Sequence, residues 1–509
     1  MSALALLLVT FPLAVALAQM PWLVGGVVIG YLLLAKQFKC LKAFSIILGV
    51  AFLYALLVYT GSVIHADIDN YLGPQVRAFL LPEGTTLDGA YKATHMTLPQ
   101  GFAAYGAALY RLTGSVDLAS SAFVLFLCAA WGVLRAHLSK LQTLLLLVCP
   151  ASFASLFSLM PDGCVYLLLL IALFSLKARN FWLTLLPATL ACTFKTTAWI
   201  PTALLAVALF LHFPRRWWQI AGVGLLTLLT VFPTLHLIWG GGLTEISDDF
   251  LTRANADAQQ MGYFARLAYV YLGHWTTSLS PDFGIHPGGV DGGGVDGYGP
   301  LFRLMIAASL LTLLLCRKRL NGWKETLILV WLSVLLMPTT YIGYARYVPW
   351  LYVAGALPLI LFVPRTTCVP AALLLVIPLG WLGWRLVLST ETVYVANRAE
   401  TVQSHVYNIR ATFREKLVEE PQPAASGSLL YTYRLPEGDS YPVMTRAYHK
   451  GLDLEPRESK AREGAQYILK RWLPWALHHP HTLFYEIVRF RAHALLHFPR
   501  GGNDGLPTP

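Results

Sequence analysis

Charged residues are scarce in this chain. Asp, Glu, Lys and Arg make up only 13% of its 509 residues, whereas a water-soluble globular domain carries about 25%. Hydrophobic residues account for 56% of the chain, and they form long runs that charged residues interrupt at regular intervals. The composition excludes a water-soluble globular class and predicts an all-α polytopic membrane protein.

Cysteine is absent from the hydrophilic parts of the sequence. Three long polar segments, residues 64–118, 240–300 and 389–509, contain none of the seven cysteines. No disulfide framework is therefore predicted in them, and no C-x-x-C spacing points to a zinc site. The basic residues behind the net charge of +11 are dispersed along the chain, so no nucleic-acid partner is expected.

About a dozen apolar stretches approach the roughly 20 residues that a spanning helix needs. We therefore expect a bundle of about 11–13 transmembrane helices. The stretches cover residues 3–18, 21–35, 43–63, 119–134, 141–159, 162–176, 181–194, 196–212, 217–239, 301–316, 324–338, 346–363 and 369–388.

Short basic connections alternate with these stretches and predict the topology. Loops rich in Lys and Arg stay on the cytoplasmic side of a membrane. In this chain the basic connections all fall on one side of the predicted spans: Lys36, Lys39 and Lys42; Arg135 and Lys140; Lys177 and Arg179; Arg215 and Arg216; Arg317, Lys318, Arg319 and Lys324; Arg365. The three long polar segments, and the short turns at Asp162, Lys195 and Arg346, are then extracytoplasmic.

The predicted organisation has six parts. Transmembrane helices cover residues 1–63, 119–239 and 301–388, extracytoplasmic loops cover 64–118 and 240–300, and an extracytoplasmic tail covers 389–509. In the tail we expect a helix over 390–420, a break at Pro421-Gln422-Pro423, and an amphipathic helix pair over 461–498.

Two terminal or loop features leave alternatives open. Ala16-Leu17-Ala18 fits a signal-peptide cleavage site, but the usual positive n-region is missing. The glycine-rich stretch 286–300 predicts a mobile loop, with calcium binding by Asp291 and Asp296 as the alternative.

Ionisable residues stand at four places on the predicted outer face, where desolvation makes them costly. Asp67 and Asp69 begin the first long loop, Asp162 and Lys195 lie in short turns, and Arg346 starts a later span. The carboxylates are suited to bind a divalent metal or to accept a proton, and the cations to neutralise a phosphate. A helix cap, a turn residue and snorkelling cations are the structural alternatives.

These motifs, in their order, resemble the GT-C superfamily of integral-membrane glycosyltransferases, which includes protein O-mannosyltransferases and aminoarabinose transferases. Its acidic motif D-E-x-x-Y is matched at both ends by Asp67 and Tyr71, with Ile68 at the second acidic position and Asp69 one residue later. The remaining matches are looser: His95 to Pro99 with the small-residue run Gly101 to Gly114, Pro161-Asp162, Lys195, Arg346-Tyr347 with Pro349, and the tail from Tyr467 to Phe498.

The resemblance implies transfer of a sugar from a polyprenyl-phosphate donor, with inversion, on the extracytoplasmic face. The compact loops and the resemblance of the tail favour a bacterial inner membrane, with an endoplasmic reticulum membrane as the alternative. Asp67 would be the general base, and Asp69 and Asp162 would assist, either by holding a divalent metal (Mg or Mn) with Asp67 or by positioning the acceptor. Lys195 and Arg346 would hold the phosphate, with Tyr71, His95 and Tyr347 as further substrate-binding residues. The acceptor is a glycan, a lipid or a protein.

The first loop is also expected to shape the acceptor site. Its segment 72–118 is rich in Gly, Ala and aromatic residues, among them Tyr91, Phe102 and Tyr105. We expect this segment to lie along the membrane and help form the acceptor groove.

Three other functions remain open. An O-antigen polymerase or ligase would rely on loop residues such as His274, His286, Arg253 and Arg266 instead of Asp67. A transporter would place paired charges at mid-membrane and show inverted repeats, neither of which is visible in the sequence. A purely structural scaffold would lose no activity when any of these residues is changed.

Overall fold

The fold is given by a computed structural model. It describes residues 2–18, 20–57, 101–113, 117–149, 152, 161–227, 262–268, 302–315, 322–339, 349–362, 418–423, 429–434 and 440–442. The α-helices are α1 (Ser2–Leu17), α2 (Pro21–Gln37), α3 (Leu41–Leu57), α6 (Gly101–Thr113), α7 (Ser121–Leu134), α8 (Lys140–Leu147), α10 (Asp162–Lys177), α11 (Phe181–Phe194), α12 (Trp199–His212), α16 (Tyr263–Ala268), α17 (Phe302–Leu315), α18 (Lys324–Leu336) and α19 (Pro349–Phe362). Short 3₁₀ helices are η2 (Asp117–Ser120), η4 (Thr196–Ala198), η5 (Pro214–Arg216) and η8 (Met337–Thr339).

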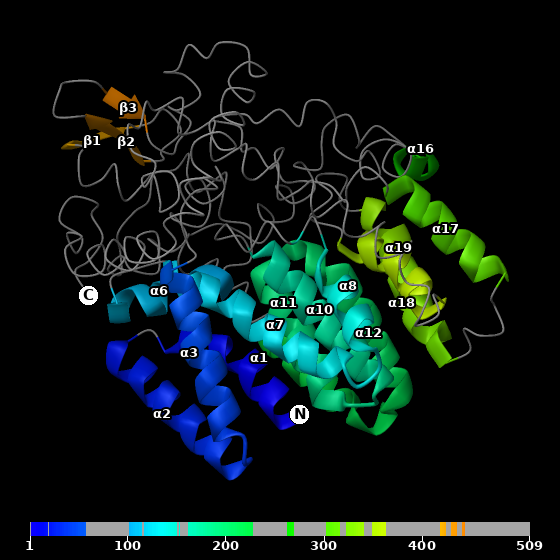
Figure 1. The fold of residues 1–509 in the computed structure, drawn as a ribbon, viewed down its shortest axis with the longest axis horizontal. Coiled ribbons are helices and arrows are strands. Elements are labelled where there is room, and N and C mark those ends of the chain that lie inside the picture. Colours follow the sequence, from blue (N-terminus) through cyan, green and yellow to red (C-terminus); the bar gives the residue numbers. More distant parts are fainter. Residues whose placement is uncertain are drawn as a thin grey trace, which may run out of the picture.

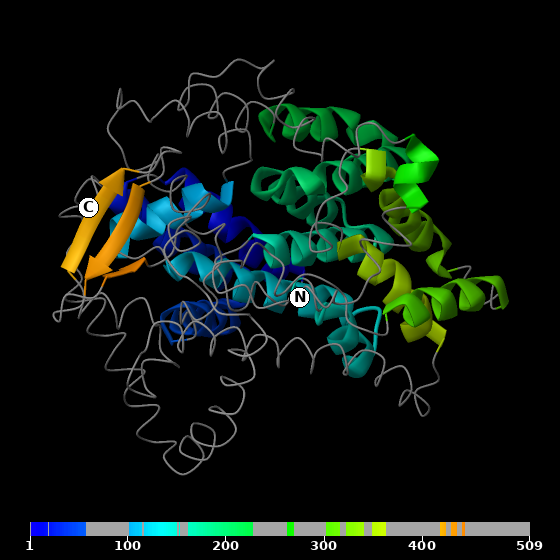
Figure 2. The same cartoon turned by 90° about the horizontal axis from the view of Figure 1, so that it is seen from above.

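The helices form one body with α10 at its centre (Figure 1). Every residue of α10 from Asp162 to Leu176 is buried, as expected for a helix that is apolar on all sides. Helices α7 and α11 pack directly against α10. Helices α2 and α3 lie at one edge of the body and α17 and α18 at the other, in both views (Figures 1 and 2).

The described residues up to 362 are helical or in turns, as predicted. The tail departs from the prediction, because it contains an antiparallel sheet of β1 (Val418–Pro423), β2 (Leu429–Arg434) and β3 (Ser440–Pro442) in the order β1-β2-β3. Val418 pairs with Arg434, and Tyr433 pairs with Tyr441. The predicted helix end at 418–420 and the break at 421–423 are therefore wrong. The two prolines are tolerated because β1 is an edge strand.

Helix α8 ends earlier than predicted. The sequence predicts one span over the apolar stretch 141–159, but the helix stops at Leu147. Pro150 follows shortly after, and a proline disfavours helical backbone in the residue before it. Two buried tyrosines then satisfy carbonyls that the helix leaves open: Tyr166 donates to the Leu146 oxygen at 2.5 Å and Tyr352 to the Leu145 oxygen at 2.8 Å.

Two tight turns, after α2 and after α10, have the same backbone conformation. Lys39 after α2 and Arg179 after α10 have positive φ values of 55° and 56°. In each turn the next residue's N–H reaches back to the helix, from Cys40 to the Ala35 oxygen at 2.8 Å and from Asn180 to the Ser175 oxygen at 2.9 Å. These are Schellman caps, with a cationic residue at the left-handed position where glycine is usual.

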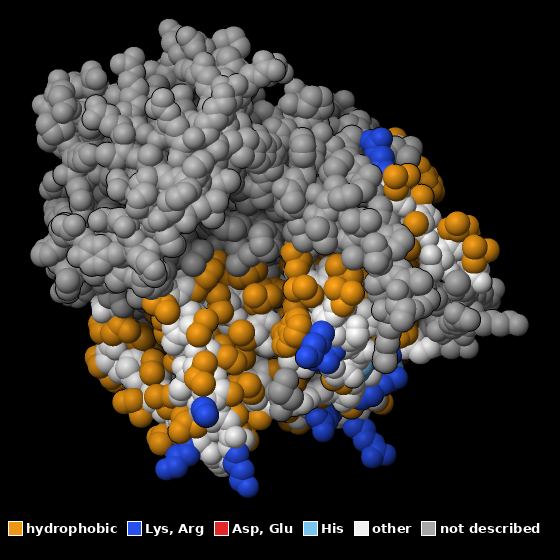
Figure 3. Space-filling view, viewed as in Figure 1, with side chains coloured by type: hydrophobic (Ala, Val, Ile, Leu, Met, Phe, Trp, Pro, Cys, Tyr) orange, Lys and Arg blue, Asp and Glu red, His pale blue; other side chains and the backbone are white. Residues whose placement is uncertain are grey.

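Apolar side chains cover much of the surface of the helical body. Leu314, Leu211 and Trp22 are 77%, 71% and 70% exposed. Figure 3 shows hydrophobic side chains over the visible face of the body, with several Lys and Arg side chains projecting from its lower edge.

Length and hydropathy single out one candidate span among the described residues, and it is bent. The helical segments Thr196–His212 and Pro214–Thr227 are long and apolar enough to span a membrane only when taken together, and the chain turns by 119° between them. No single helix among the described residues is long and apolar enough by itself.

Candidate functional site

An ion pair joins the ends of two neighbouring helices. Asp162 is the first residue of α10, directly after Pro161 at the N-cap, where the helix dipole favours a negative charge. Lys195 is the C-cap residue of α11. The Lys195 Nζ donates to the Asp162 Oδ1 at 2.5 Å. Two residues that the sequence placed in separate outer turns are thus in direct contact.

The pair is mostly shielded from solvent. The side chain of Asp162 is 2% exposed and that of Lys195 is 15% exposed. The second carboxylate oxygen, Asp162 Oδ2, is buried and has no hydrogen-bond partner among the residues that the structure describes. A buried acceptor without a donor costs free energy, so this oxygen is a place where a hydroxyl or another donor would be stabilised.

Helix α6 forms an apolar wall beside the pair. The Phe102 ring lies 5.5 Å from the Phe194 ring, centroid to centroid, and Phe126 lies 6.0 Å from Phe194. Gly101 packs closely on Thr193, since a Cβ at Gly101 would come within 2.5 Å of the Thr193 Oγ1. The start of α6 therefore approaches the end of α11 just before Lys195.

Two aromatic residues of the segment 72–118, which was expected to help form the acceptor groove, are buried. Phe102 is 3% exposed and Tyr105 is fully buried. The Tyr105 hydroxyl shares a hydrogen bond of 2.6 Å with the Ser121 hydroxyl of α7. Both rings belong to the core because α6 packs against α1 and α11 instead of lying free along the surface.

Most other predicted site residues lie outside the described part of the chain: Asp67, Asp69, Tyr71, His95, Arg346 and Tyr347, together with Arg253, His274 and His286 of the ligase alternative, Asp291 and Asp296 of the calcium alternative, and Tyr91. The backbone of Arg266 lies in α16. The predicted roles of these residues remain predictions.

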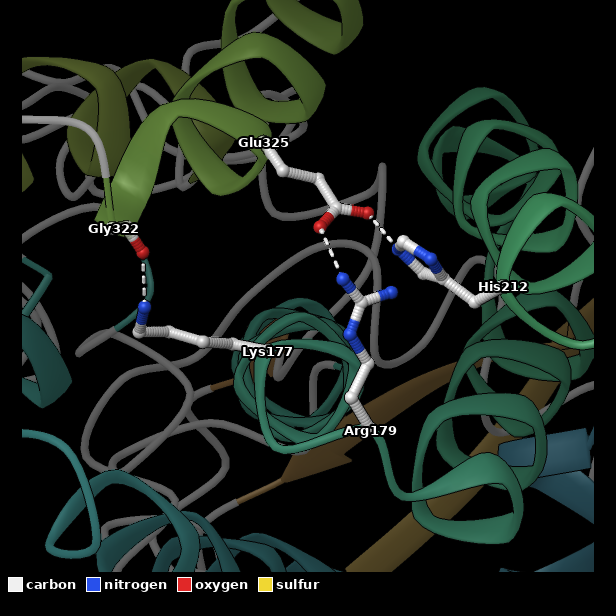
Figure 4. A network of polar contacts seen from close by, with 5 residues as sticks. All are labelled: Lys177, Arg179, His212, Gly322 and Glu325. Carbon is white, nitrogen blue, oxygen red and sulfur yellow. Dashed lines mark hydrogen bonds and ion pairs between the residues drawn. The ribbon is translucent and has the colours of Figure 1, made fainter.

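A second polar cluster lies at the opposite end of α10 (Figure 4). The Glu325 carboxylate contacts Arg179 Nη2 at 3.7 Å and His212 Nε2 on its other oxygen. Lys177 donates to the Gly322 carbonyl and lies 4.0 Å above the Trp323 ring centroid. The connections after α10 and α12 and before α18, which the sequence placed on one side, thus meet at one end of the body.

Sequence reasoning did not single out Glu325 or His212. The available signal was an acidic residue directly after Lys324, in a connection that is otherwise basic. A lone carboxylate among cations is a natural partner for them.

A half-open apolar cavity of about 300 Å³ lies between α11, α12 and the segment Pro214–Thr227. We call it the α11–α12 groove. Its lining runs along α11 from Leu185 to Cys192, a length of about 10 Å at 1.5 Å per residue. Gly224 lines the facing segment. At one end of the groove the lining residue Ile220 lies one helical turn along the chain from Arg216. At the other end the lining residue Cys192 lies three positions before Lys195.

Metal binding at Asp162 does not fit the contacts that the structure gives. One carboxylate oxygen is taken by an ammonium group, and a divalent cation is poorly placed next to that positive charge. Among the described residues no three His, Cys, Asp or Glu side chains gather as a metal site. The predicted metal ligands Asp67 and Asp69 lie outside these residues.

The chain matches no protein-family model, and it has no significant similarity to a curated protein or to a solved structure.

Proposed function

We propose that the protein is an integral-membrane glycosyltransferase. It moves a sugar from a polyprenyl-phosphate donor to a cell-envelope glycan, a lipid or a protein. In this proposal the chain crosses the bacterial inner membrane about 11–13 times, and its active site lies on the extracytoplasmic face.

Two features support the membrane location. Large apolar side chains such as Leu314 and Trp22 are exposed on the helical body, where contact with lipid would remove the cost of hydrating them. The basic connections around Lys177, Arg179 and His212 gather at one end, which suits the cytoplasmic side of a membrane.

The observation that carries the catalytic proposal is the buried contact between Asp162 and Lys195. It lies at the end of α10 opposite the basic connections, about 22 Å away along the helix axis from Lys177. Because Lys195 is little exposed to solvent, water screens the electrostatic attraction between its ammonium group and a phosphate only weakly. Asp162 holds the ammonium group in place and keeps the pair neutral until the donor arrives.

The chemistry follows from these roles. The acceptor hydroxyl oxygen attacks the anomeric carbon of the donor sugar, and the bond from that carbon to the phosphate oxygen breaks. Asp67 takes the hydroxyl proton. Lys195 and Arg346 stabilise the charge that develops on the departing polyprenyl phosphate. Asp69 and the free Oδ2 of Asp162 orient the acceptor, with Tyr71, His95 and Tyr347 as further substrate contacts. No step requires a metal at Asp162.

Complementation in cells tests the proposal. Envelope glycans, lipids and glycoproteins are compared by mass spectrometry in cells that lack the protein and receive wild type, Asp67→Asn or Lys195→Met at equal expression. Wild type is expected to restore a missing sugar mass, and each variant to reduce the product by at least about 100-fold. Glu325→Gln, which also neutralises a carboxylate but at the other end of α10, is expected to match wild type.

Full restoration by Asp67→Asn would overturn the proposed base and favour the polymerase or ligase alternative. If Lys195→Met restored the sugar product as well as wild type, the Asp162–Lys195 pair would have a structural role and no catalytic one.

A further inference from the structure

We propose that the α11–α12 groove binds one acyl chain of an anionic phospholipid, whose headgroup lies against Arg215 and Arg216. This site differs from the proposed sugar-transfer site and rests only on the membrane location of the protein.

The groove is shaped and lined for hydrocarbon. Leucine, alanine, isoleucine and glycine residues supply most of its wall. Such a lining gives water few hydrogen bonds, and an empty cavity forfeits dispersion contacts. The neighbouring residues Val207, Leu225 and Leu226 are exposed, so the open side of the groove is continuous with an apolar surface.

Charge complementarity selects the headgroup. The Arg216 guanidinium lies 5.0 Å from the Phe181 ring centroid and 5.8 Å from that of Phe213. These two rings lie 5.6 Å apart, one helical turn along the chain from the lining residues Leu185 and Leu209. No carboxylate among the described residues pairs with Arg215 or Arg216, and both are exposed.

The other end of the groove offers a less accessible cation. Lys195 is the nearest one there, and its side chain is 15% exposed and pairs with Asp162 at 2.5 Å, whereas Arg215 and Arg216 are exposed. Trp217 and Trp218, directly after the two arginines, are 60% and 59% exposed. Tryptophan is enriched where a membrane protein meets the headgroup region, and anionic lipids are found in the cytoplasmic leaflet.

Lipid titration of the full-length protein tests the site. The purified protein in detergent is titrated with dioleoylphosphatidylglycerol or with the zwitterionic dioleoylphosphatidylcholine, and bound lipid is counted by native mass spectrometry. The anionic lipid is expected to bind at least about tenfold more tightly. The pair Arg215→Gln and Arg216→Gln is expected to remove this preference, whereas Lys36→Gln with Lys39→Gln is expected to keep it.

A matched pair of glycines tests the groove itself. A Cβ added at Gly224 or at Gly222 would meet no atom within 4 Å, so the backbone at both positions has room for a Cβ, but only Gly224 of the two lines the groove. Gly224→Leu is expected to weaken phosphatidylglycerol binding at least about tenfold, and Gly222→Leu to leave it unchanged.

Three results would overturn the proposal: equal binding of the two lipids, equal effects of the two glycine substitutions, or displacement of the lipid by a polyprenyl phosphate in a manner that Lys195→Met abolishes. The titration does not depend on sugar transfer. A wild-type protein that transfers sugar but does not prefer the anionic lipid therefore refutes the groove site alone. A wild-type protein that binds the anionic lipid but transfers no sugar refutes the transferase alone.

Discussion

Asp162 and Lys177 stand at the two ends of the same buried helix, and each contacts a group from another element. Asp162 pairs with Lys195 of the α11 C-cap, and Lys177 donates to Gly322 before α18. The helix between them is apolar and buried throughout. The charged residues of α10 are thus confined to its two ends, and the first prediction below probes the end at Asp162.

The Asp162–Lys195 pair is expected to stabilise the fold as a unit. Asp162→Asn or Lys195→Met alone breaks this mostly buried ion pair, at a cost of about 3 kcal/mol in the free energy of unfolding. The double variant is expected to cost clearly less than the sum of the two. Unfolding in detergent, followed by a thermal shift, measures this coupling. Additive losses would show that the two side chains act independently.

Gly101 is expected to be intolerant of a side chain. Its Cβ position lies 2.5 Å from the Thr193 Oγ1 and 2.8 Å from the Thr193 carbonyl oxygen, and a backbone atom does not move aside easily. Gly101→Ala is therefore expected to cost about 1–3 kcal/mol of stability. Gly49→Ala in α3, where nothing lies within 4 Å, serves as the control and is expected to be neutral or stabilising. A melting temperature for Gly101→Ala equal to that of wild type would contradict this packing.

Stability is expected to fall in mild acid because of His137. Burial lowers the pKa of His137 below its ordinary value of 6.5, the Lys177 charge lowers it further, and a backbone hydrogen bond with Phe174 partly offsets both. The unfolded chain then binds a proton before the folded one does, so stability is complete above the unfolded pKa and is lost as pH falls through the folded pKa.

Melting temperatures of wild type and His137→Gln, measured between about pH 7.5 and pH 5, check this expectation. The wild type is expected to lose more stability than the variant over that range. Parallel curves would assign the acid sensitivity to groups other than His137.

Lys39 is expected to be a point of backbone strain. A non-glycine residue at a φ of 55° costs about 1 kcal/mol relative to glycine. Lys39→Gly is therefore expected to raise the melting temperature. Lys39→Ala removes the same charge but keeps the side-chain Cβ, and is expected to give no gain. Equal effects of the two substitutions would attribute the change to charge and not to backbone strain.

The sequence predicted the helices well where hydrophobicity and end signals coincide. The predicted stretch 181–194 coincides with α11, whose N-cap Asn180 accepts from the Leu183 N–H at 3.2 Å. The prediction of one helix over 141–159 was wrong because an apolar run indicates burial and does not show where backbone hydrogen bonding ends. The segment 418–423 failed because strand pairing depends on β2, a partner that local patterns do not reveal.

The candidate site was predictable in part. Alternation of basic connections along the chain placed Asp162 and Lys195 on one side of the bundle. Their contact depends on how α10 packs on α11, which no pattern within either helix specifies. Likewise, the burial of Phe102 and Tyr105 follows from α6 packing against α1, a long-range contact that a glycine- and alanine-rich stretch does not announce by itself.

The tyrosine cap on α8 joins parts of the chain that are made far apart in time. Tyr352 follows Leu145, whose carbonyl it satisfies, by 207 positions, and Gln142 of α8 donates to Ile360 across 218 positions. At a synthesis rate of about 5–20 residues per second, the ribosome needs roughly 10–40 s to supply that donor. During this interval the end of α8 lacks its final hydrogen bond. A chain that stops before residue 352 therefore lacks the hydrogen bond to the Leu145 carbonyl, so its defect lies in the interior of the protein and not at its edge.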